Sequence, residues 1–323
     1  MTVSFVIPLY NRPDEISELL TSFLSVRRPE SGLDYEIVIV EDGSSIPAGL
    51  VVSSFRDRLP ILYLTQQNTG PSGARNHGAS DARGEWLIFL DSDTILPEGY
   101  FDALIPVLND PETGLFGGPD RGHADFSPLQ KGISYSMTSL LTTGGIRGQK
   151  DGGGSADVFY PRTFNMGIRK TLFDRLGGFD VRMRYGEDLD LSMRATESGA
   201  KSRLVPAAWL YHKRRTDFGA FFRQVRHSGK ARWVLERKHP GTMKPVHWLP
   251  FLFSAGLALS VVIPPLLGLY VLYAVLILLD ATLSYRYSFE EALNAVAASF
   301  VQHLGYGTGF VKGALRGHRN TPD

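Results

Sequence analysis

The stretch that decides the fold is an apolar run of strand length that ends in two carboxylates, Glu85-Trp86-Leu87-Ile88-Phe89-Leu90-Asp91-Ser92-Asp93. In a parallel α/β sheet, ligands bind at the carboxyl ends of the strands, so we expect Asp91 and Asp93 at the rim of a pocket. Mg²⁺ or Mn²⁺ usually takes one or two protein carboxylates and fills its other positions with water and phosphate oxygens. Because such acidic pairs also occur in solvated loops, other motifs must agree before the pair predicts a metal-bridged diphosphate.

The length and composition limit the class of protein. With 323 residues, 43% of them hydrophobic, the chain can bury a sizeable core and still form a second unit. The net charge of +1 argues against a nucleic-acid partner. The absence of cysteine excludes disulfides and thiolate chemistry, and it fits a reducing compartment. The amino terminus lacks the pattern of a signal peptide and is expected to form a first strand.

Strands and helices alternate along the first part of the chain. Apolar runs predict strands at residues 3–9, 35–40, 61–64 and 85–90, and helical spacing predicts helices after Pro13, over 75–82, after Pro97, over 170–176 and over 187–198. This alternation predicts an α/β fold with a mostly parallel, doubly wound sheet and helices on both faces. Between Pro119 and Pro161 the pattern fades into a glycine-rich stretch. We expect a mobile loop there, either a lid over bound substrate or an ordinary flexible connection.

Residues 248–279 contain no charged side chain and are interrupted only by Pro264-Pro265. This run is longer than one membrane span and shorter than two, so a tight hairpin of two short helices is the first expectation; the alternatives are one long kinked helix and a buried soluble helix. The preceding residues 213–244 hold ten Lys or Arg, which favours the cytoplasmic side of a membrane. Residues 292–310 are mildly apolar and predict a third, interfacial or packed helix.

Five motifs with residues that could bind a ligand or take part in catalysis follow one another along the chain. They are Val6-Ile7-Pro8-Leu9-Tyr10-Asn11; Val40-Glu41-Asp42-Gly43-Ser44; Asn68-x-Gly70 with Ala74-Arg75-Asn76-x-Gly78; Phe89-Leu90-Asp91-Ser92-Asp93; and Gly177-Gly178-Phe179-Asp180 leading to Gly186-Glu187-Asp188. With these motifs, residues 1 to 225 resemble the family 2 glycosyltransferases, which have the GT-A fold. The resemblance implies an enzyme that binds a nucleoside diphosphate sugar together with Mg²⁺ or Mn²⁺.

The resemblance also implies roles for individual donor-site residues. Pro8 and Tyr10 are expected to contact the nucleotide sugar, and Glu41 or Asp42 is expected to accept the N–H of the base. A turn-capping role for Asp42 is the alternative, and both roles are compatible. Arg75 would face the base or the diphosphate, or else be a solvated helix arginine. Asp91 would bond the ribose or the sugar.

The metal and the reaction follow from the same resemblance. Asp93 would ligate the metal and His212 is a candidate second metal contact, although a lone histidine is often structural. Asp188 would take the proton of the acceptor hydroxyl, and Glu187 would orient the acceptor or support Asp188. Alternatively, both acids only favour the positive end of their helix. A base and a metal on opposite faces of the sugar imply a single displacement with inversion.

The segment Gly229-Lys230-Ala231-Arg232-Trp233 is similar to the Gln-x-x-Arg-Trp motif of processive polysaccharide synthases. Gly229 replaces the glutamine, which argues against processive synthesis. Arg232 and Trp233 are alternatively expected to anchor at the membrane interface.

Three regions are therefore expected: a GT-A catalytic domain over residues 1–225, a basic juxtamembrane linker over 226–247 and membrane-associated apolar helices over 248–323. The predicted function is an inverting glycosyltransferase at the cytoplasmic membrane, with its catalytic domain facing the cytoplasm and membrane lipids as partners. Its acceptor hydroxyl would belong to a glycan or a lipid-linked, membrane-proximal molecule. Transfer to polyisoprenyl phosphate and a non-catalytic sugar-nucleotide-binding membrane subunit are the alternatives.

Overall fold

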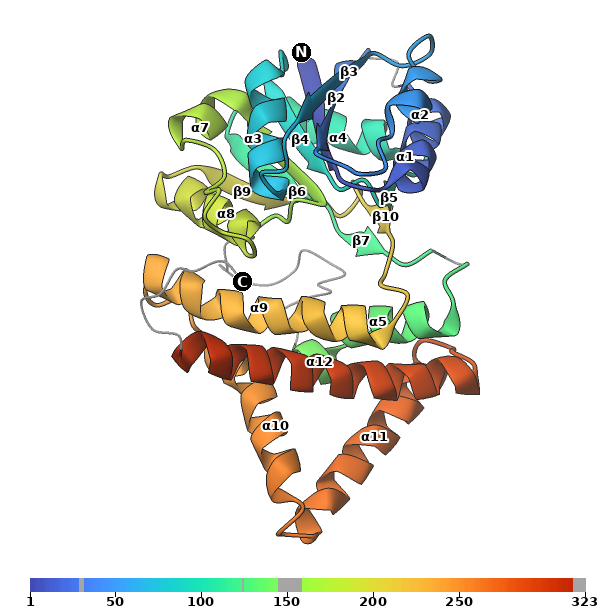
Figure 1. The fold of residues 1–323 in the computed structure, drawn as a ribbon, viewed down its shortest axis with the longest axis vertical. Helices are drawn as coiled ribbons and strands as arrows, with labels where there is room; N and C mark the ends of the chain where they lie inside the picture. The colour runs from blue at the N-terminus through green and yellow to red at the C-terminus, as the bar shows by residue number, and fades with distance from the viewer. Residues whose placement is uncertain (29–31, 124, 145–158, 316–323) are drawn as a thin grey trace. The chain divides into compact units, whose positions relative to one another are not determined.

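The computed structural model of the protein describes residues 1–28, 32–123, 125–144 and 159–315 (Figure 1). The chain divides into two compact units. The first unit comprises residues 1–121 and 151–213, and the second comprises residues 122–150 and 214–323. Residues 214–225, which we expected in the catalytic domain, therefore belong to the second unit.

The first unit is built on a seven-stranded sheet with the order β3-β2-β1-β4-β8-β6-β9. Its strands are β1 (Thr2–Leu9), β2 (Asp34–Asp42), β3 (Ile61–Gln66), β4 (Trp86–Leu90), β6 (Thr113–Gly117), β8 (Asn165–Arg169) and β9 (Lys201–Leu204). Among the described strands of this sheet, only β8 runs antiparallel to its neighbours, which are β4 and β6. The predicted α/β class with a mostly parallel sheet is confirmed.

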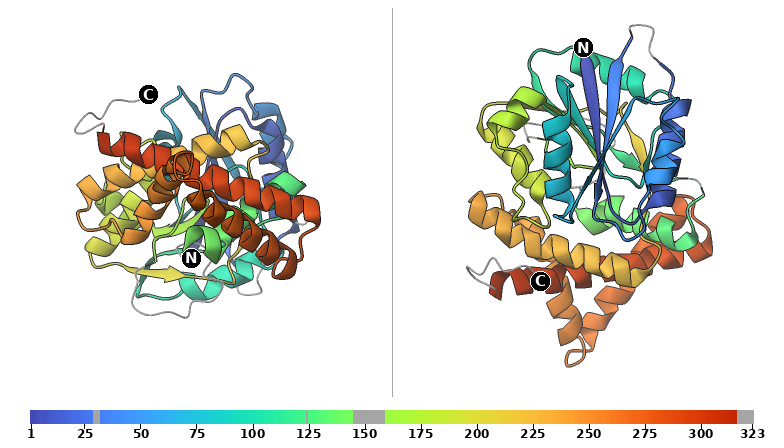
Figure 2. Two further views of the ribbon diagram at one scale, coloured as in Figure 1. Left: turned by 90° about the horizontal axis from the view of Figure 1, so that it is seen from below. Right: turned by 45° about the horizontal axis from the view of Figure 1, so that its top comes forward.

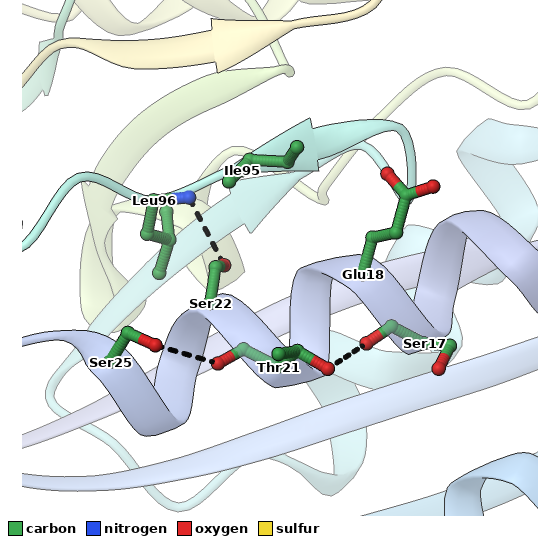
Figure 3. A pocket seen from close by; sticks show the side chains of 7 residues that line it. All are labelled: Ser17, Glu18, Thr21, Ser22, Ser25, Ile95 and Leu96. Carbon is green, nitrogen blue, oxygen red and sulfur yellow. Dashed lines mark hydrogen bonds between the residues drawn. The ribbon is translucent and has the colours of Figure 1, made fainter.

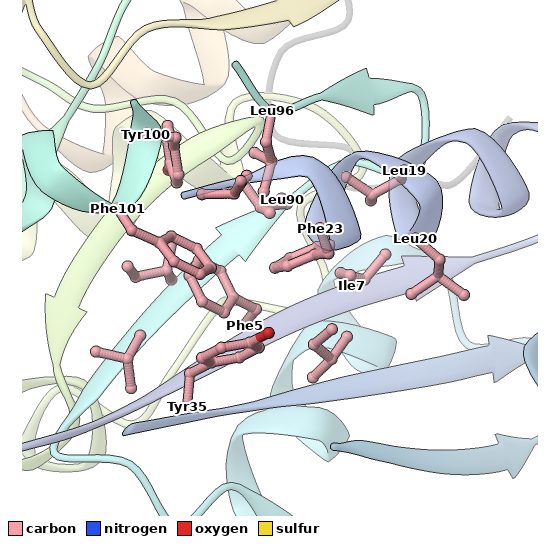
Figure 4. Packing of buried hydrophobic residues seen from close by; sticks show 14 of the residues in the cluster. Phe5, Ile7, Leu19, Leu20, Phe23, Tyr35, Leu90, Leu96, Tyr100 and Phe101 are labelled. Carbon is pink, nitrogen blue, oxygen red and sulfur yellow. The ribbon is translucent and has the colours of Figure 1, made fainter. Parts of the chain in front are cut away.

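Helices cover both faces of this sheet, as the right view of Figure 2 shows for α1 and α3. One face packs against α1 (Pro13–Ser25), α2 (Gly49–Ser53) and α4 (Tyr100–Leu108), and the other against α3 (Pro71–Asp81), α7 (Lys170–Arg175) and α8 (Glu187–Glu197). Successive side chains of a strand point to opposite faces, so Phe5 and Ile7 enter the first core while Val6 enters the second. In the first core, the Phe5 ring lies 5.1 Å from Phe23 and 5.7 Å from Phe101 (Figure 4).

A three-stranded sheet joins β5 (Thr94–Ile95), β10 (Leu210–His212) and β7 (Asp120–Arg121). Its register sets His212 opposite Thr94, and the backbone N–H of Lys213 donates to the carbonyl of Asp93 at 3.1 Å. This small sheet therefore places His212, near the end of the first unit, beside the acidic pair that follows β4.

The second unit is helical. It contains α5 (Pro128–Thr138), α6 (Leu140–Thr143), α9 (Phe218–Lys238), η1 (Pro245–Trp248), α10 (Leu249–Leu259), α11 (Pro265–Leu283) and α12 (Phe289–Leu315). Within this unit, α12 packs closely on α9 through Gly305, Gly309 and Gly313, because side chains there would meet the backbone or side chains of α9. Among the described residues, α11 is the one helix long and apolar enough to cross a membrane.

Several expectations outside the sheet have clear outcomes. The stretch between Pro119 and Pro161, expected as a loop, instead contains α5, whose Ser127 cap and Gln130 form a capping box. The glycine-rich residues 145–158, with the expected lid, lie outside the described residues. The expected linker over 226–247 is largely occupied by α9 and η1, and the expected third apolar helix over 292–310 lies within α12.

Candidate active site

The carboxylates of Asp91 and Asp93 lie immediately after β4, where the backbone turns into β5. The N–H of Thr94 donates to the carbonyl of Asp91 at 3.2 Å, which closes this turn. One carboxylate oxygen of Asp91, one of Asp93 and one ring nitrogen of His212 all lie within 4.8 Å of one another. The structure thus brings together three predicted site residues from β10 and from the turn that follows β4.

The side chains of Arg12 and His212 hold the carboxylate of Asp93. Arg12 Nη1 lies 2.5 Å from one oxygen, and His212 Nε2 lies 3.2 Å from the other. Burial alone would raise the pKa of Asp93, but the hydrogen bond and charge of His212, joined by Arg12, outweigh it and hold the pKa well below its usual range. Burial of the imidazole lowers the pKa of His212, but the hydrogen bond and charge of Asp93 outweigh burial, so the pKa of His212 is raised.

This donor set fits a hard divalent cation. Two carboxylates and an imidazole are ligands that Mn²⁺ accepts, and Mg²⁺ accepts the carboxylates. The buried Nδ1 of His212 has no hydrogen-bond partner, and the Asp120 carboxylate lies 3.9 Å away. The positive charge that Asp93 requires is present here as Arg12 and His212, the role that a bound cation would otherwise fill. The three residues could therefore hold a metal ion.

Arg75 connects this acidic pair to the predicted catalytic carboxylates. Its side chain is 5% exposed, and its two terminal nitrogens lie 2.8 Å from Asp91 and 3.0 Å from Glu187. Arg75 is therefore not a solvated helix residue but a buried bridge between two anions. Burial and the neighbouring charge of Asp188 raise the pKa of Glu187 to about 7, against the opposing charge of Arg75.

Asp188 lies in the first turn of α8, beside Glu187. Its carboxylate is 3.2 Å from Arg162 Nη1, and its own oxygen accepts the N–H of Leu189 at 2.7 Å. The side chain of Asp188 is 13% exposed and that of Arg162 is 34% exposed. The pair thus presents one acid and one guanidinium together at the edge of the cluster.

The two carboxylates at the end of β2 accept hydrogen bonds from other residues of the first unit. Glu41 accepts from Ser44, from Ala48 N at 2.8 Å and from Tyr63 OH at 2.8 Å. The oxygens of Asp42 accept from the N–H groups of Thr69 and Gly70, both at 2.9 Å, and from Gln66 at 2.7 Å. These bonds join Asp42 to the segment that precedes α3 and not to the turn at Gly43, and an N–H of a base would have to share these oxygens.

The first motif lies at the end of β1. Pro8 pairs with Val40 in the sheet, and Tyr10, just beyond the strand, is 50% exposed. Asn11 ties this end to the loop after β2, because its N–H donates to Ser44 Oγ at 2.8 Å and its side-chain oxygen accepts from Ile46 N at 3.0 Å. The ends of β1, β2 and β4 are thus linked through Asn11, Ser44 and Arg12.

Two arginines of this cluster were not predicted from the sequence. Arg12 follows the first strand directly, so its position at the same sheet edge as Asp93 was a usable signal. Arg162 lies in a segment without periodic pattern, and nothing in the sequence indicates that it meets Asp188.

One hollow in the described part of the chain lies away from these acids, on α1. It measures about 370 Å³ and is lined by Ser17, Glu18, Thr21, Ser22, Ser25, Ile95 and Leu96 (Figure 3). Its polar groups are already satisfied, because Ser22 Oγ accepts from Leu96 N at 3.1 Å and Glu18 pairs with Lys213 at 2.6 Å. It holds no group that would attract a ligand, so the acidic cluster is the better candidate site.

The processive-synthase resemblance also has a structural outcome within the second unit. A side chain at Gly229 would place its Cβ 2.2 Å from the carbonyl oxygen of Tyr306, so a glutamine cannot be accommodated there. Arg232 instead donates to Thr242 at 2.6 Å, and the Trp233 ring packs 5.2 Å from that of Phe310.

Proteins similar to this chain include glycosyltransferases. A pre-mycofactocin glycosyltransferase of Mycobacterium tuberculosis is 26% identical over 248 residues, which are 76% of this chain and 49% of the relative. The succinoglycan biosynthesis protein ExoO of Rhizobium meliloti is 28% identical over 229 residues, 66% of this chain and 61% of the relative. This chain therefore spans about half to three fifths of the length of these relatives.

Solved structures share the fold. The mannosyltransferase PcManGT from Pyrobaculum calidifontis, in complex with GDP-Man and Mn²⁺, has a TM-score of 0.58 and 18% identity, over 98% of this chain and 88% of that one. S. aureus TarS 1-349 in complex with UDP has a TM-score of 0.51 and 17% identity, over 93% and 90%. The fold and these relatives define the class, a glycosyltransferase with the GT-A fold. The sequence model of Glycosyl transferase family 2 matches residues 4–177, and the chain belongs to that family.

Proposed function

We propose that this family 2 enzyme transfers a sugar, with inversion, from a nucleoside diphosphate sugar to the hydroxyl of a lipid-linked or membrane-proximal acceptor, using Mn²⁺ or Mg²⁺. The observation that supports this proposal most strongly is that ligand atoms of Asp91, Asp93 and His212 lie within 4.8 Å of one another, next to Arg75, which contacts Glu187. This arrangement would place a cation site beside the acids Glu187 and Asp188. The proposed sugar transfer needs both a cation and a base.

In the donor half of the site, Asp93 and His212 would hold the metal, and Asp91 would hold the ribose or sugar. A bound divalent ion would offset the charge that builds on the departing diphosphate. Because Arg12 and His212 now contact the Asp93 carboxylate, a metal ion held by Asp93 would need His212 in its neutral form and would leave Arg12 available to the phosphates. The complex of PcManGT with GDP-Man and Mn²⁺ is consistent with this donor chemistry.

In the acceptor half, Asp188 would accept the proton of the attacking hydroxyl. Glu187 and Arg75 are positioning residues, because Arg75 fixes Glu187 at 3.0 Å and Asp91 at 2.8 Å through one rigid guanidinium. A base on the face opposite the leaving diphosphate gives one displacement, hence inversion.

The second unit supports a location at a membrane. Its helices α10 and α11 expose apolar side chains, and residues 214–244 of the same unit carry nine Lys or Arg. Such a surface would hold the enzyme at an anionic cytoplasmic leaflet, where lipid-linked acceptors are found.

The proposal is tested by incubating the detergent-solubilised protein with a panel of nucleotide sugars and a lipid extract, with Mn²⁺ or with chelator. We expect one sugar donor to release its nucleoside diphosphate, only with metal and faster when the extract is added. Donor binding without any transfer would contradict the proposal, and equal turnover in chelator would remove the role of Asp93.

A second candidate, transfer to polyisoprenyl phosphate, is favoured by Arg162, whose guanidinium beside Asp188 suits a phosphate acceptor. Such an acceptor is already ionised and needs no strong base. The variant Asp188→Asn separates the two reactions. Loss of about 100-fold or more in turnover, with donor binding retained, indicates a hydroxyl acceptor, whereas near-normal turnover indicates a phosphate.

A further inference from the structure

The apolar hairpin formed by α10 and α11 is largely exposed among the residues that the structure describes. Residues 248–279 carry no charge, and within α11 only Ile277 and Ala281 are buried. Exposed large side chains lie along both arms and the turn: Leu249, Leu252, Leu259, Val261, Val262, Ile263, Leu267, Leu269, Val271, Leu272, Val275, Leu276 and Leu279. Along α11 they recur every one to three residues from Leu267 to Leu279, and with the turn they form a broad apolar surface whose chemistry fits lipid.

The length of α10, the shorter arm, limits how far the hairpin can enter a bilayer. Gly307 of α12 lies so close to the start of α10 that a Cβ there would be 2.5 Å from the Pro250 carbonyl oxygen, and Ser254 Oγ donates to the carbonyl of His303 at 3.2 Å. From that contact α10 continues only to Leu259. Its 11 residues extend about 16 Å at 1.5 Å per residue, roughly half of the 30 Å hydrocarbon core of a bilayer.

The longer arm returns to the same helix. Tyr273 OH of α11 lies 2.8 Å from His303 Nε2, and Ile277 and Ala281 pack against Ala292 and Ala295 of α12. Figure 1 shows the two arms meeting at a single turn and both reaching α12 at their other ends. Although α11 has 19 residues, only those from Pro265 to Leu272 lie between this contact and the turn, and they extend about 12 Å at 1.5 Å per residue.

The turn between the arms is suited to lipid and not to water. Val261 is 85% exposed and Val262 is 75% exposed. The N–H groups of Val262 and Ile263 both donate to the carbonyl of Leu259 at 3.0 Å, Ser260 Oγ donates to Leu257 O at 2.7 Å, and the two prolines that follow have no N–H. In hydrocarbon every N–H needs an internal partner, and this turn meets that condition.

Within residues 248–283, tryptophan and charged residues occur only at the roots of the hairpin, and the hydroxyls of Tyr270 and Tyr273 between them contact Phe253 O and His303. Trp248 lies where α10 begins and is 41% exposed. Asp280 and Tyr285 lie where α11 ends. A pair of spanning helices would also place aromatic or charged residues at the turn, but residues 259–265 contain neither. The hairpin therefore has one interface and not two.

We propose that α10 and α11 form a re-entrant hairpin that enters a single leaflet, with its turn near the bilayer midplane and α12 at the level of the headgroups. The proposal rests on the membrane location proposed above and adds that α11, despite its length and composition, does not cross the bilayer. Both ends of the hairpin then face the same compartment.

The test uses the absence of native cysteine. Full-length Val262→Cys and Glu290→Cys are bound from outside to sealed vesicles of phosphatidylcholine and phosphatidylglycerol and treated with a charged maleimide, either outside or trapped in the lumen. We expect Glu290→Cys to react from outside, and Val262→Cys to lose its reaction from both sides until detergent is added. A fluorophore at position 262 should be quenched more by lipids labelled deep in the acyl chain than by headgroup-labelled lipids.

Each opposite outcome has a distinct meaning. Reaction of Val262→Cys with the lumenal reagent would show that the hairpin spans the bilayer, which overturns the re-entrant proposal but keeps the membrane location. Equal reaction of Val262→Cys with and without vesicles would overturn both. Neither result depends on sugar transfer, so the proposed chemistry would stand.

A pair of lysine variants gives an independent measurement. We expect Val262→Lys to lose co-sedimentation with the vesicles, because it places a charge at the deepest point. Leu50→Lys changes a side chain on α2 of the first unit that is 91% exposed, and it should co-sediment like the native protein. Equal co-sedimentation of the two variants would contradict insertion of the turn.

Discussion

Among single residues, Glu187 determines how the charge of the site responds to pH. The folded state raises its pKa from 4.5 to about 7, through burial first and Asp188 second. Between these two values the folded chain holds a proton that the unfolded chain has released, so stability falls as pH rises through this window and levels off above it.

We expect Glu187→Gln to lack this dependence. Relative to the variant, the native protein should lose roughly 3 kcal/mol of unfolding free energy between pH 4.5 and pH 7, as the difference in pKa implies. Urea titrations of both proteins at the two pH values measure it. A constant difference between the proteins would show that Glu187 titrates normally.

Arg12 would compete with the proposed metal ion for the carboxylate of Asp93. Its guanidinium lies 2.5 Å from the carboxylate and is 31% exposed, so it can leave without being trapped in the core. We expect Arg12→Ala to bind Mn²⁺ severalfold more tightly in the absence of nucleotide, measured by the electron paramagnetic resonance of free Mn²⁺. Arg27→Ala, which removes a solvent-exposed arginine paired at 3.9 Å with Asp102, is the control. Weaker Mn²⁺ binding by Arg12→Ala would mean that Arg12 helps to form the metal site.

At this scale, the sequence predicts the acids better than their partners. Asp91 and Asp93 could be placed because a buried strand ends directly before them. His212 could be named only from the family resemblance, since its position depends on the register of β10 against β5, which no local pattern contains. That Arg75 bridges Asp91 and Glu187 could not be foreseen, because the contact joins α3 to α8 across 112 residues.

Among the structural elements, the close contact of α12 with α9 holds the second unit together. A Cβ at Gly309 would lie 1.9 Å from the carbonyl oxygen of Arg226, so the two helices could not approach as they do. We expect Gly309→Ala to destabilise the unit by about 1–3 kcal/mol, as overpacking does.

The matched control for this variant is Gly268→Ala in α11. No heavy atom lies within 4 Å of the added Cβ there, and alanine favours a helix over glycine by up to about 1 kcal/mol. Thermal unfolding in detergent, followed by circular dichroism, compares the two. Equal melting temperatures for both variants would show that the α9–α12 contact does not limit stability.

The elements themselves were predictable where one period dominates. Strands β1, β2, β3 and β4 and helices α1, α7 and α8 follow from apolar runs and helical spacing, whereas β6 and β9 were not predicted. Helix α5 was missed although Ser127 and Gln130 have the spacing of a capping box, a signal that the surrounding lack of pattern obscured. Strand β8 was also missed, because its five residues mix Asn165 and Gly167 with the apolar Met166 and Ile168.

For the whole molecule, the acidic cluster and the apolar hairpin belong to different units. We therefore expect Val262→Lys, when detached from vesicles, to bind nucleoside diphosphate as the native protein does while losing transfer to a lipid acceptor. Calorimetric titration and a radiolabelled-sugar assay with vesicles measure the two properties. Loss of nucleotide binding in this variant would show that the hairpin is needed for the donor site.

The most direct test is calorimetric titration of the matching nucleoside diphosphate into the native protein and into Asp93→Asn, each with Mn²⁺ and with chelator. We predict tight binding only for the native protein with Mn²⁺, because Asp93 and His212 would hold the ion that bridges to the phosphates. Equal affinity of the native protein in Mn²⁺ and in chelator, or unchanged metal-dependent binding by Asp93→Asn, would contradict a metal-bridged sugar donor at this edge of the sheet.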